Sequence, residues 1–465
     1  MARGKYAKKR NDFRLVIIVL LLIAIVSVTA IILNRCSSSS SGENTLPDAY
    51  TDSPGTPTTE RTEPTTEPTT EPTTEPTTAP TEPYIVSTAS IGVTGDILIH
   101  SPIFKAAHEG NGIYDFSEVF TYISDYFERY DYMVANLEVP VAGAEAGYTG
   151  YPNFNCPDTI VDALKDAGVD MLLSANNHTY DQGHKGFIRT QETLNEKGMP
   201  YLGTRLSEDT PMYIVQEING IKVGMVCYTY ETGRTSSGRK TLNGITVKQE
   251  DTNLIGSFHP KQLDEFYEEV DEILAAMHED GAEVTMVYIH WGEEYQLKQN
   301  NQQQTIAENL CELGVDVIVG GHPHVVQPFE VLTSETGHQT YCIYSVGNAL
   351  SNQRRTAISQ APDGHTEDGV IFGVTFQKWN DGTVEVCAVD VLPIWVCKEW
   401  SNSKGNIYYI LPLDPELEEW NGFDISDNSY KYLKGSYKRT MKTVGEGLNA
   451  CREALGLEPI PLEYE

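Results

Sequence analysis

Apolar and polar residues follow three different patterns along this chain of 465 residues. Residues 15–33, LVIIVLLLIAIVSVTAIIL, form a continuous apolar run without a charged side chain. Residues 37–83 are dominated by Thr, Glu, Pro and Ser, and apolar side chains are sparse there. From residue 84 onward, short apolar runs alternate with longer amphipathic stretches, which is typical of a folded domain. The patterns predict a membrane-spanning segment, a spacer and a globular part, in that order.

The short apolar runs of the globular part are predicted to be β-strands, because each ends at a polar or glycine-containing turn. They are residues 90–93, 132–135, 169–174, 284–289 and 315–319. The amphipathic stretches predict helices at residues 116–130, 157–168, 260–278 and 302–313, and another that ends near Gly198. This alternation of strands and helices is typical of α/β proteins.

Two hairpins interrupt the alternation. Asn219-Gly220 lies between two apolar runs and is a strong hairpin signal. Residues 380–383, NDGT, separate strands predicted at 371–379 and 384–391. We therefore predict an α/β domain over residues 84–396, with a mixed sheet or two stacked sheets. Residues 397–465 are predicted to be a C-terminal helical extension, with a helix at 430–455 packed on the domain.

The apolar run at residues 15–33 is predicted to be a transmembrane helix, because about 20 apolar residues span a hydrocarbon core. The preceding basic tail, residues 1–14, predicts a cytoplasmic N-terminus and an extracellular globular domain. A cleaved signal peptide is the alternative. The length of the run and the residues Arg35-Cys36 after it fit cleavage poorly, so we favour a single-pass anchor.

The segment at residues 37–83 repeats the motif TEPT and is predicted to be a disordered, semi-extended spacer. At about 3.1 Å per residue its reach approaches about 150 Å. A spacer of this length between membrane and domain suits a Gram-positive type of cell envelope, with a wall to enter or cross.

Charge narrows the possible partners. The chain carries a net charge of −33, and −31 remains on the globular part once the basic N-terminal region (+6) and the acidic spacer (−8) are set aside. Such a field disfavours nucleic acid and attracts cations. A polyanion could bind to this acidic domain only at a locally basic patch of its surface. The eight cysteines form neither a CxxC zinc pattern nor a regular disulfide framework.

Five predicted strands end in residues of one chemical kind, namely Asp96, Glu138, Asn177 with His178, His290, and His322 with His324. In open α/β sheets, ligands bind beyond the carboxyl ends of the strands. If the five ends converge, carboxylates, an amide oxygen and imidazoles meet at one point. Oxygen and nitrogen ligands mixed in this way suit one or two divalent ions of Mn, Fe or Zn.

These motifs resemble those of the CapA/PgsA family, which is named for poly-γ-glutamate capsule biosynthesis. The resemblance runs from about Ser90 to Val396. It rests on TGD (94–96), ANLE (135–138), ANNH (175–178) with Asp181 and Gly183, HWG (290–292), GHPHV (321–325) and YSVGN (344–348). The family in turn resembles the calcineurin-like metallophosphoesterases. The resemblance implies a four-layer α/β/β/α sandwich with a two-metal site.

The resemblance also implies a role for each site residue. Asp96 and His324 would hold one metal; Asn177, His290 and His322 would hold the other, with Glu138 bridging the two. His178 takes the place of the histidine that contacts the scissile group or protonates the leaving group. Asp181 either orients His178 as part of the catalytic pair or caps the following helix.

One position departs from the metallophosphoesterase pattern. That pattern begins Asp-x-His, but Leu98 stands where the histidine is expected. His100, two residues further, either substitutes for it or packs against the domain. The first metal position is therefore weaker than the family pattern implies.

The leading hypothesis for function is a membrane-anchored, extracytoplasmic protein that acts in capsule or cell-surface polymer biosynthesis or processing through a metal-dependent hydrolase site. Its expected partners are the membrane, an anionic or wall-linked polymer substrate and other envelope-biosynthesis subunits. The alternative is a non-catalytic polymer-binding or assembly component of an envelope synthesis or export complex, which the missing histidine favours. A stalked surface adhesin explains the spacer but not the metal-binding pattern.

Overall fold

The computed structural model of the protein describes residues 82–361, 363–417 and 422–462. The predicted basic tail (1–14), the predicted transmembrane helix (15–33) and all but the last two residues of the predicted spacer lie outside these ranges. Among the described residues, none of the helices has the length and apolar character needed to span a membrane.

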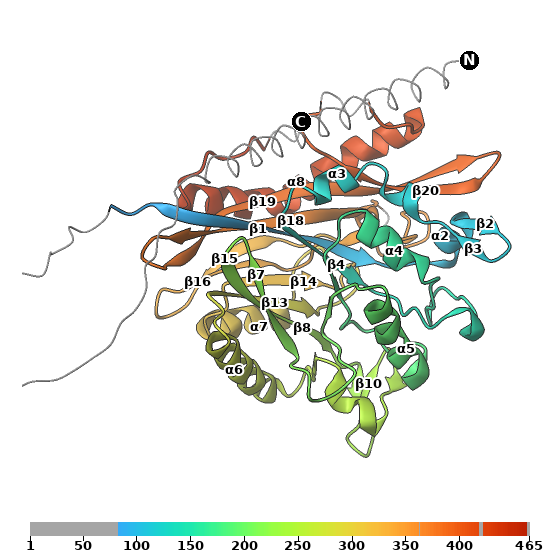
Figure 1. Ribbon diagram of the computed structural model, residues 1–465. Coiled ribbons are helices and arrows are strands. Elements are labelled where there is room, and N and C mark those ends of the chain that lie inside the picture. Colours follow the sequence, from blue (N-terminus) through green and yellow to red (C-terminus); the bar gives the residue numbers. More distant parts are fainter. Residues whose placement is uncertain (1–81, 362, 418–421, 463–465) are drawn as a thin grey trace, which may run out of the picture. The chain divides into compact units, whose positions relative to one another are not determined.

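Two β-sheets form the centre of the domain (Figure 1). The first sheet has eight strands, and β1, β4, β5 and β6 run parallel in it, as expected where helices connect successive strands. β17 pairs with the end of β1. In spatial order the strands of the first sheet are β20 (Gly405–Pro412), β19 (Val384–Ser401), β18 (Asp368–Trp379), β1 (Ile85–Ile97), β4 (Tyr132–Leu137), β5 (Met171–Leu173) and β6 (Tyr201–Leu202), with β17 at Asn348–Leu350.

The second sheet has seven strands and is also mixed. Five of them run parallel, whereas β7 and β15 are antiparallel to their neighbours. In spatial order they are β12 (Ser257–Phe258), β8 (Ile221–Tyr230), β13 (Val284–His290), β14 (Val317–Gly321), β16 (Gln339–Ile343) and β15 (Phe329–Thr333), with β7 (Tyr213–Ile218) on β8. Both predicted hairpins are confirmed, at Asn219-Gly220 between β7 and β8 and at residues 380–383 between β18 and β19.

An apolar core lies between the two sheets. Ile91 and Val93 of β1 belong to the same buried cluster as Met225 of β8, Met286 of β13 and Val317 of β14. Side chains alternate between the two faces of a strand, so the opposite faces must be covered separately. Both sheets are therefore buried on two sides, which agrees with the near-continuous apolar sequences of β8 and β13.

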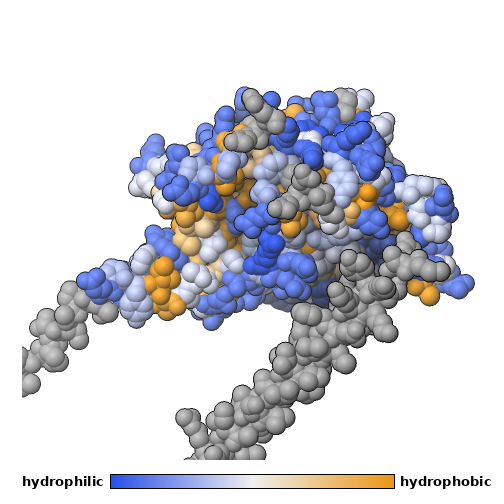
Figure 2. Space-filling model, turned by 90° about the horizontal axis from the view of Figure 1, so that it is seen from above, coloured by the Kyte–Doolittle hydropathy of each residue, from blue (hydrophilic) through white to orange (hydrophobic). Residues whose placement is uncertain are grey.

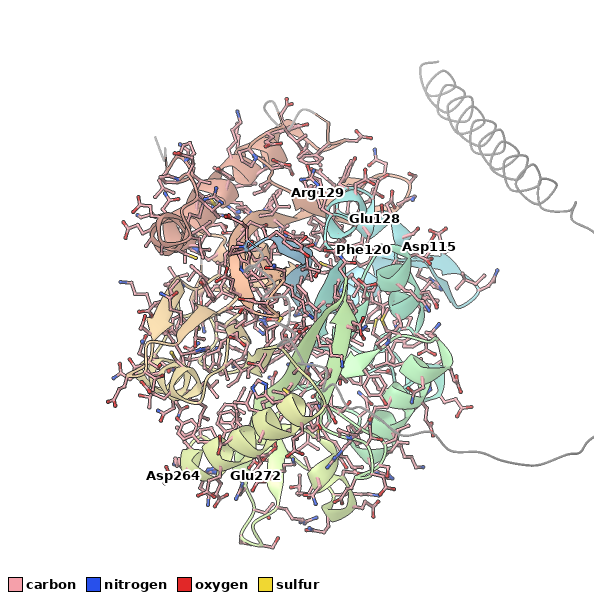
Figure 3. The ribbon with its side chains drawn as sticks, turned by 60° about the vertical axis from the view of Figure 1, so that its left-hand side comes forward. Asp115, Phe120, Glu128, Arg129, Asp264 and Glu272 are labelled. Atoms are coloured by element: carbon pink, nitrogen blue, oxygen red, sulfur yellow. The ribbon has the colours of Figure 1, made fainter. Side chains whose placement is uncertain are left out.

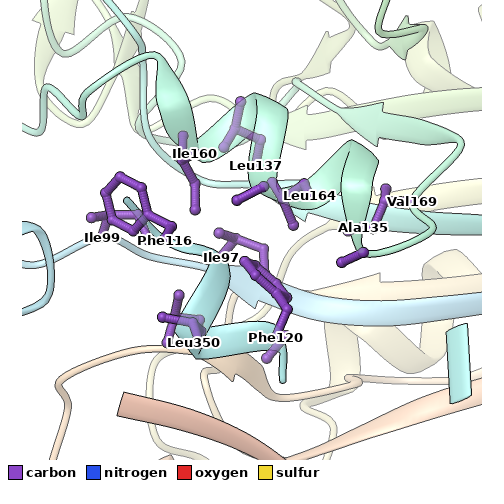
Figure 4. Packing of buried hydrophobic residues seen from close by; sticks show 14 of the residues in the cluster. Ile97, Ile99, Phe116, Phe120, Ala135, Leu137, Ile160, Leu164, Val169 and Leu350 are labelled. Carbon is purple, nitrogen blue, oxygen red and sulfur yellow. The ribbon is translucent and has the colours of Figure 1, made fainter. Parts of the chain in front are cut away.

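Helices cover the outer faces. α6 (Leu263–Glu279) and α7 (Asn301–Glu312) pack on the second sheet through Phe266, Leu274 and Ile306. Asn300 and Gln303 form a capping box that fixes the start of α7. α4 (Thr159–Asp166) packs on the first sheet, where Ile160 and Leu164 meet Ile97 and Leu137 (Figure 4). The predicted mixed α/β fold is confirmed.

α5 (Gly183–Glu196) follows the carboxyl end of β5 and leads into β6. α8 (Asp427–Ala454) contacts β19 of the first sheet and β15 of the second, and Met441, Val444 and Leu448 join the core between the sheets. This helix confirms the one predicted at 430–455.

Two predictions need correction. Residues 116–130 do not form one helix but two short ones, η1 (Ser117–Phe120) and α3 (Ser124–Phe127), because the Thr121 and Ser124 hydroxyls donate to backbone carbonyls and compete with a continuous helix. The predicted helical extension at 397–465 begins instead as sheet, since residues 397–412 complete β19 and form β20. Buried Cys397, Tyr408 and Ile410 supply the apolar face of that hairpin.

The remaining elements are short, and five of their strands form two further small sheets. They are α2 (Ser101–Ala106), β2 (His108–Gly110), β3 (Ile113–Tyr114), η2 (Ala144–Ala146), β9 (Gly233–Arg234), β10 (Lys240–Leu242), β11 (Ile245–Thr246), η3 (Gln249–Leu254) and η4 (His365–Glu367).

The outer surface is mainly hydrophilic on the face shown in Figure 2. Asp264 and Glu272 lie on the exposed side of α6 (Figure 3), which agrees with the strongly negative charge of the chain.

Candidate metal centre

The five predicted strand ends converge at one edge of the two stacked sheets. β1, β4 and β5 contribute Asp96, Glu138 and the Asn177-His178 pair from the first sheet. β13 and β14 contribute His290 and the His322-His324 pair from the second. All of these side chains are buried, with exposed fractions of 4% or less. Parallel strands bring their carboxyl ends to the same edge, and this register places the residues together.

One group consists of Asp96, Glu138 and His324. The Nδ1 atom of His324 lies 3.0 Å from Oδ2 of Asp96, and its Nε2 atom lies 3.8 Å from Oε1 of Glu138. One donor atom from each of the three residues lies within 4.8 Å of the other two. Two carboxylates and one imidazole are a set that can hold a divalent ion.

A second group consists of Glu138, His290 and His322, again with donor atoms within 4.8 Å of one another. The Nε2 atom of His290 lies 3.0 Å from Oδ1 of Asn177 and 3.3 Å from Oε1 of Glu138. Asn177 therefore adds an amide oxygen to this group. Glu138 belongs to both groups, which is the position that a bridging ligand requires.

Two buried atoms of the centre have no hydrogen-bond partner among the residues that the structure describes, namely Oε1 of Glu138 and Nδ1 of His322. An unpartnered buried polar atom costs about 1–3 kcal/mol, and buried polar groups in folded proteins are nearly always paired. Both atoms belong to the second group, and the Glu138 oxygen also faces the first. The residues therefore fit one or two divalent metal ions, whose coordination would satisfy both atoms.

The protonation states also suit metal ligation. Burial lowers the pKa of His290 to about 3, and burial holds the pKa of His322 well below its ordinary value. Both imidazoles are therefore neutral at physiological pH, which is the form that binds metals. Burial acts to raise the pKa of Asp96, but the hydrogen bond and charge of His324 hold it below the ordinary value. Burial and the Asp96 carboxylate raise the pKa of Glu138 well above its ordinary value.

The backbone around the two histidines of GHPH is unusual. His322 has a φ of +95° and His324 a φ of +56°, a region that residues with a side chain rarely occupy. Such backbone strain clusters at functional sites. Gly321 also leaves room here, because a Cβ atom at this position would make a tight contact of 3.2 Å with Oδ1 of Asp96. In TGD, a Cβ atom at Gly95 would lie 2.0 Å from the carbonyl oxygen of Gly347.

His178 and Asp181 form a buried pair beside the metal ligands. The Nδ1 atom of His178 lies 2.7 Å from Oδ2 of Asp181, and the same oxygen accepts the backbone N–H of Phe154 at 2.7 Å. A carboxylate against Nδ1 leaves Nε2 as the ring nitrogen that can exchange a proton with a ligand. Asp181 therefore orients His178. It does not cap α5, whose N-cap residue is Gln182.

Three residues of the centre carried no role in the sequence interpretation. Asn136 donates its amide to Oδ1 of Asp96 at 2.7 Å, and Asn176 donates to Oδ1 of Asn136 at 3.2 Å. Asn243 donates to Oδ1 of Asp181 at 2.8 Å. Asn136 and Asn176 lie in the motifs ANLE and ANNH, directly beside or near the expected ligands, so their amides could have been predicted to support those ligands. Asn243 precedes Gly244 in a β-hairpin and was indistinguishable from an ordinary turn residue.

Leu98 and His100 lie outside the two metal-binding groups. Leu98 is buried in the apolar cluster beneath the first sheet, so no imidazole replaces the one expected there. His100 packs edge-on against Phe154 with ring centres 5.3 Å apart, and its Nδ1 atom lies 3.1 Å from the carbonyl oxygen of Leu98. Burial lowers the pKa of His100 to about 4. Of the two roles considered for His100, the geometry supports packing.

A family model described as bacterial capsule synthesis protein PGA_cap matches residues 90–353. The chain is 26% identical over 319 residues to the PGA biosynthesis protein CapA of Bacillus subtilis (strain 168), a match that covers 66% of this chain and 73% of that protein. It is 28% identical over 309 residues to the capsule biosynthesis protein CapA of Bacillus anthracis, covering 65% of this chain and 66% of that one.

Among solved structures, the chain is similar to the crystal structure of TT1561 of Thermus thermophilus, with 7% identity over 61% of this chain and 94% of that chain. The TM-score of 0.31 is too low to bear on the fold or the function of this protein.

Proposed function

The chain belongs to the bacterial capsule synthesis protein family PGA_cap, and from this membership and the metal centre we propose that it acts in capsule or cell-surface polymer biosynthesis through metal-dependent hydrolysis. One observation carries the hydrolytic part of the proposal. The unpartnered Oε1 atom of Glu138 is buried between the two groups of potential ligands. Buried polar atoms are nearly always paired, and coordination of a metal ion would give this oxygen the partner that it lacks.

The ions that suit this set are Mn, Fe or Zn. Asp96 and His324 would hold one, Asn177, His290 and His322 the other, and Glu138 both. Divalent ions bound there supply Lewis-acid polarisation of the scissile group and activation of a water molecule. The two stacked sheets with helices on their outer faces support a metallophosphoesterase-like interpretation of the centre.

His178 would act as the proton donor to the leaving group. Asp181 holds Nδ1 of the ring, so Nε2 is the nitrogen available to a substrate. Asn243 and the Phe154 backbone fix Asp181 in turn, which makes the orientation of the ring independent of the substrate. General acid catalysis of this kind contributes about 10²–10⁴-fold to a rate.

The proposed substrate is an anionic or wall-linked polymer of the poly-γ-glutamate type, as the names of the relatives suggest, and the bond attacked is a phosphoester or an amide. We further propose that residues 15–33 anchor the chain in the membrane with the N-terminus in the cytoplasm. The domain would then act outside the cell, held on the spacer of residues 37–83, together with other envelope-biosynthesis subunits.

The test is the metal content of the purified chain together with its hydrolysis of a generic phosphodiester and of a γ-linked glutamate polymer. We expect bound divalent metal in the wild-type protein, and loss of both metal and turnover in the double variant His290→Ala, His322→Ala. Lys105→Ala, a substitution on the surface of α2, is the matched control. A wild-type chain that binds no divalent metal would sink the hydrolytic proposal.

A non-catalytic assembly role is the second candidate, and the apolar environment of Leu98 favours it, because the Asp96 group contains only one imidazole. This candidate expects polymer production in cells to survive loss of the ligands and to fail when residues 15–33 are deleted. The hydrolytic proposal expects both changes to stop production.

A further inference from the structure

A cavity of about 600 Å³ opens at the ends of β8 and β12 and under α6. Its lining is mostly polar and includes Arg205, Arg234 and Lys240, together with Glu231 and Glu269. The volume is in the range of ligand sites, about 300–1,000 Å³. A polar lining of this kind suits a hydrophilic, charged ligand and not an apolar one.

The cations of this cavity are only partly neutralised. Arg234 is paired with Glu231 at 2.8 Å. Lys240 and Arg205 form no ion pair with a carboxylate of the described chain. Lys240 donates to the backbone carbonyl of Ile255, and Arg205 donates to the backbone carbonyls of Asn253, Glu208 and Thr210. The cavity therefore holds two cations without an ion pair in a domain whose net charge is −31.

Lys240 is the more informative of the two, because it is only 6% exposed. Its Nζ atom donates to the carbonyl of Ile255 at 2.9 Å and to the hydroxyl of Ser257 at 2.8 Å. Burial lowers the pKa of Lys240 to about 8, although Glu231 and Glu269 act to raise it and Arg234 acts to lower it. Lysine is rarely buried this deeply without a partner of opposite charge.

Two short stretches of chain run from the lining of the cavity to residues that contact the catalytic groups. Glu231, which lines it, follows Tyr230, whose ring lies 4.8 Å from that of His322. Lys240 and Asn243 stand three residues apart in the hairpin of β10 and β11, and Asn243 contacts Asp181. A chain bound in the cavity therefore lies next to the edge of the sheet at which hydrolysis is proposed.

We propose that this cavity is an anion subsite in which Lys240 and Arg205 bind a carboxylate of the polymer, one or more units away from the bond at the metal centre. The inference rests on the proposed function for the identity of the polymer. It explains how a strongly acidic domain can hold an anionic chain, since the attraction is confined to one cavity. Charge-assisted hydrogen bonds supply the specificity for carboxylate oxygens.

The experiment measures binding of a short γ-linked oligoglutamate to the full chain by calorimetry, in the presence of a chelator so that the metal centre does not contribute. We expect Lys240→Met to weaken binding by about tenfold or more, as for loss of a charge-assisted hydrogen bond. Arg239→Gln is the matched control, because Arg239 directly precedes Lys240, is exposed in the turn between β9 and β10, and does not line the cavity. It should leave binding unchanged.

A second measurement uses the unaltered protein and does not depend on the folding of a variant. Calorimetry in buffers of different ionisation enthalpy should detect proton uptake on binding at pH 8–9 but not at pH 6. The reason is that a bound carboxylate raises the pKa of Lys240 above its value of about 8 in the free protein.

Equal binding by the wild type and Lys240→Met, or no proton uptake at pH 8–9, would overturn the subsite. Inorganic phosphate serves as a competitor: if it binds in a Lys240-dependent manner and the oligoglutamate does not, the assignment to a carboxylate is wrong. Lys240-dependent binding in a chain that lacks metal or turnover would leave the subsite standing and remove the hydrolytic proposal.

Discussion

Two clusters of buried acidic residues lie in this domain, and they differ in how their oxygens are satisfied. At the metal centre, Oε1 of Glu138 has no hydrogen-bond donor within the described part of the chain. In the second cluster, Glu367 and Asp368 are equally buried at the start of β18, but each carboxylate is fully paired. Arg355 and Arg354 contact Glu367. Arg439 and Ser436 of α8 donate to both oxygens of Asp368 at 2.6–2.8 Å.

The comparison separates a structural use of buried charge from a functional one. Both clusters carry a desolvation cost, because a buried carboxylate loses its hydration. In the Glu367–Asp368 cluster, donors from the fold offset that cost: the pKa of Glu367 is held below its ordinary value, whereas burial still raises the pKa of Asp368 despite its bonds to Arg439. The bonds to Asp368 attach α8 to the first sheet. At the metal centre, His324 offsets the cost for Asp96, but the cost for Glu138 stays uncompensated in the absence of a bound ligand. The two clusters should therefore respond in opposite ways when a carboxylate is replaced by its amide.

The largest effect is expected for Asp368→Asn. This change leaves the Arg439 guanidinium facing a neutral amide in a buried site, and breaking a buried ion pair from one side costs about 3–5 kcal/mol. Urea unfolding of the wild type and the variant gives the difference in the free energy of unfolding. Because α8 also packs on β15 of the second sheet, the loss should appear in the unfolding of the whole domain.

Glu118→Gln is the matched control for that measurement. Its carboxylate pairs with Lys404 at 2.8 Å, but both side chains are about half exposed. Exposed pairs contribute about 0–1 kcal/mol, so the variant should unfold almost as the wild type does. Similar losses for Asp368→Asn and Glu118→Gln would mean that burial does not decide the value of these pairs.

The second-largest effect, on divalent-metal affinity, is expected for Glu138→Gln. Removing the carboxylate shared by the two groups should weaken divalent-metal binding at least about 100-fold, the upper range seen even for residues that only support ligands. In the metal-free protein, the same change should leave the free energy of unfolding unchanged or raise it, since burial and the Asp96 carboxylate already disfavour the charged form of Glu138 and raise its pKa well above the ordinary value. Metal titration and urea unfolding with a chelator measure the two quantities.

A destabilisation of several kcal/mol by Glu138→Gln in the metal-free protein would contradict the comparison, because Glu138 would then be paired in the fold as Asp368 is. Asn136→Ala is a useful companion variant. It removes the donor to Asp96 without removing a ligand, so it should lower metal affinity less than Glu138→Gln does.

The same contrast explains what the sequence could and could not predict. Strand periodicity located β1, β4, β5, β13 and β14, and because parallel strands share an edge, the polar residues that follow them had to converge. The resemblance to a family then implied the two metal positions and the bridging role of Glu138. These predictions depend on local pattern and on a general rule of α/β topology, and a single sequence carries both.

The paired cluster could not be predicted in the same way. Asp368 meets Arg439 across 71 positions of the chain, and no periodicity links them. Asn243 reaches Asp181 from a hairpin whose Asn-Gly sequence indicates only a turn. The sequence predicts residues 397–412 as part of a helical extension, but they continue the first sheet. Their place in the sheet depends on contacts that only the folded chain forms, and the local sequence pattern does not carry these contacts.

The smallest effect is a pH dependence expected from Glu367. Burial acts to raise its pKa, but the hydrogen bonds of Arg355 and the charge of Arg354 hold it below the ordinary glutamate value of 4.5. A carboxylate whose pKa is lower in the folded state stabilises the fold above its unfolded pKa, and the contribution disappears as the pH falls through the folded value. Glu367→Gln should therefore cost about 1.5–3 kcal/mol at pH 7, as for hydrogen bonds to a charged group.

The difference between the wild type and Glu367→Gln should narrow as the pH falls below about 4.5, because the wild-type carboxylate becomes protonated and then resembles the amide. Urea unfolding of both proteins across that range measures it, with Glu118→Gln as the exposed reference. A difference that stays constant with pH would show that Glu367 acts through shape and not through charge. The Glu367–Asp368 cluster would then owe its stability to Asp368 and Arg439 alone, and the contrast with the metal centre would rest on that one ion pair.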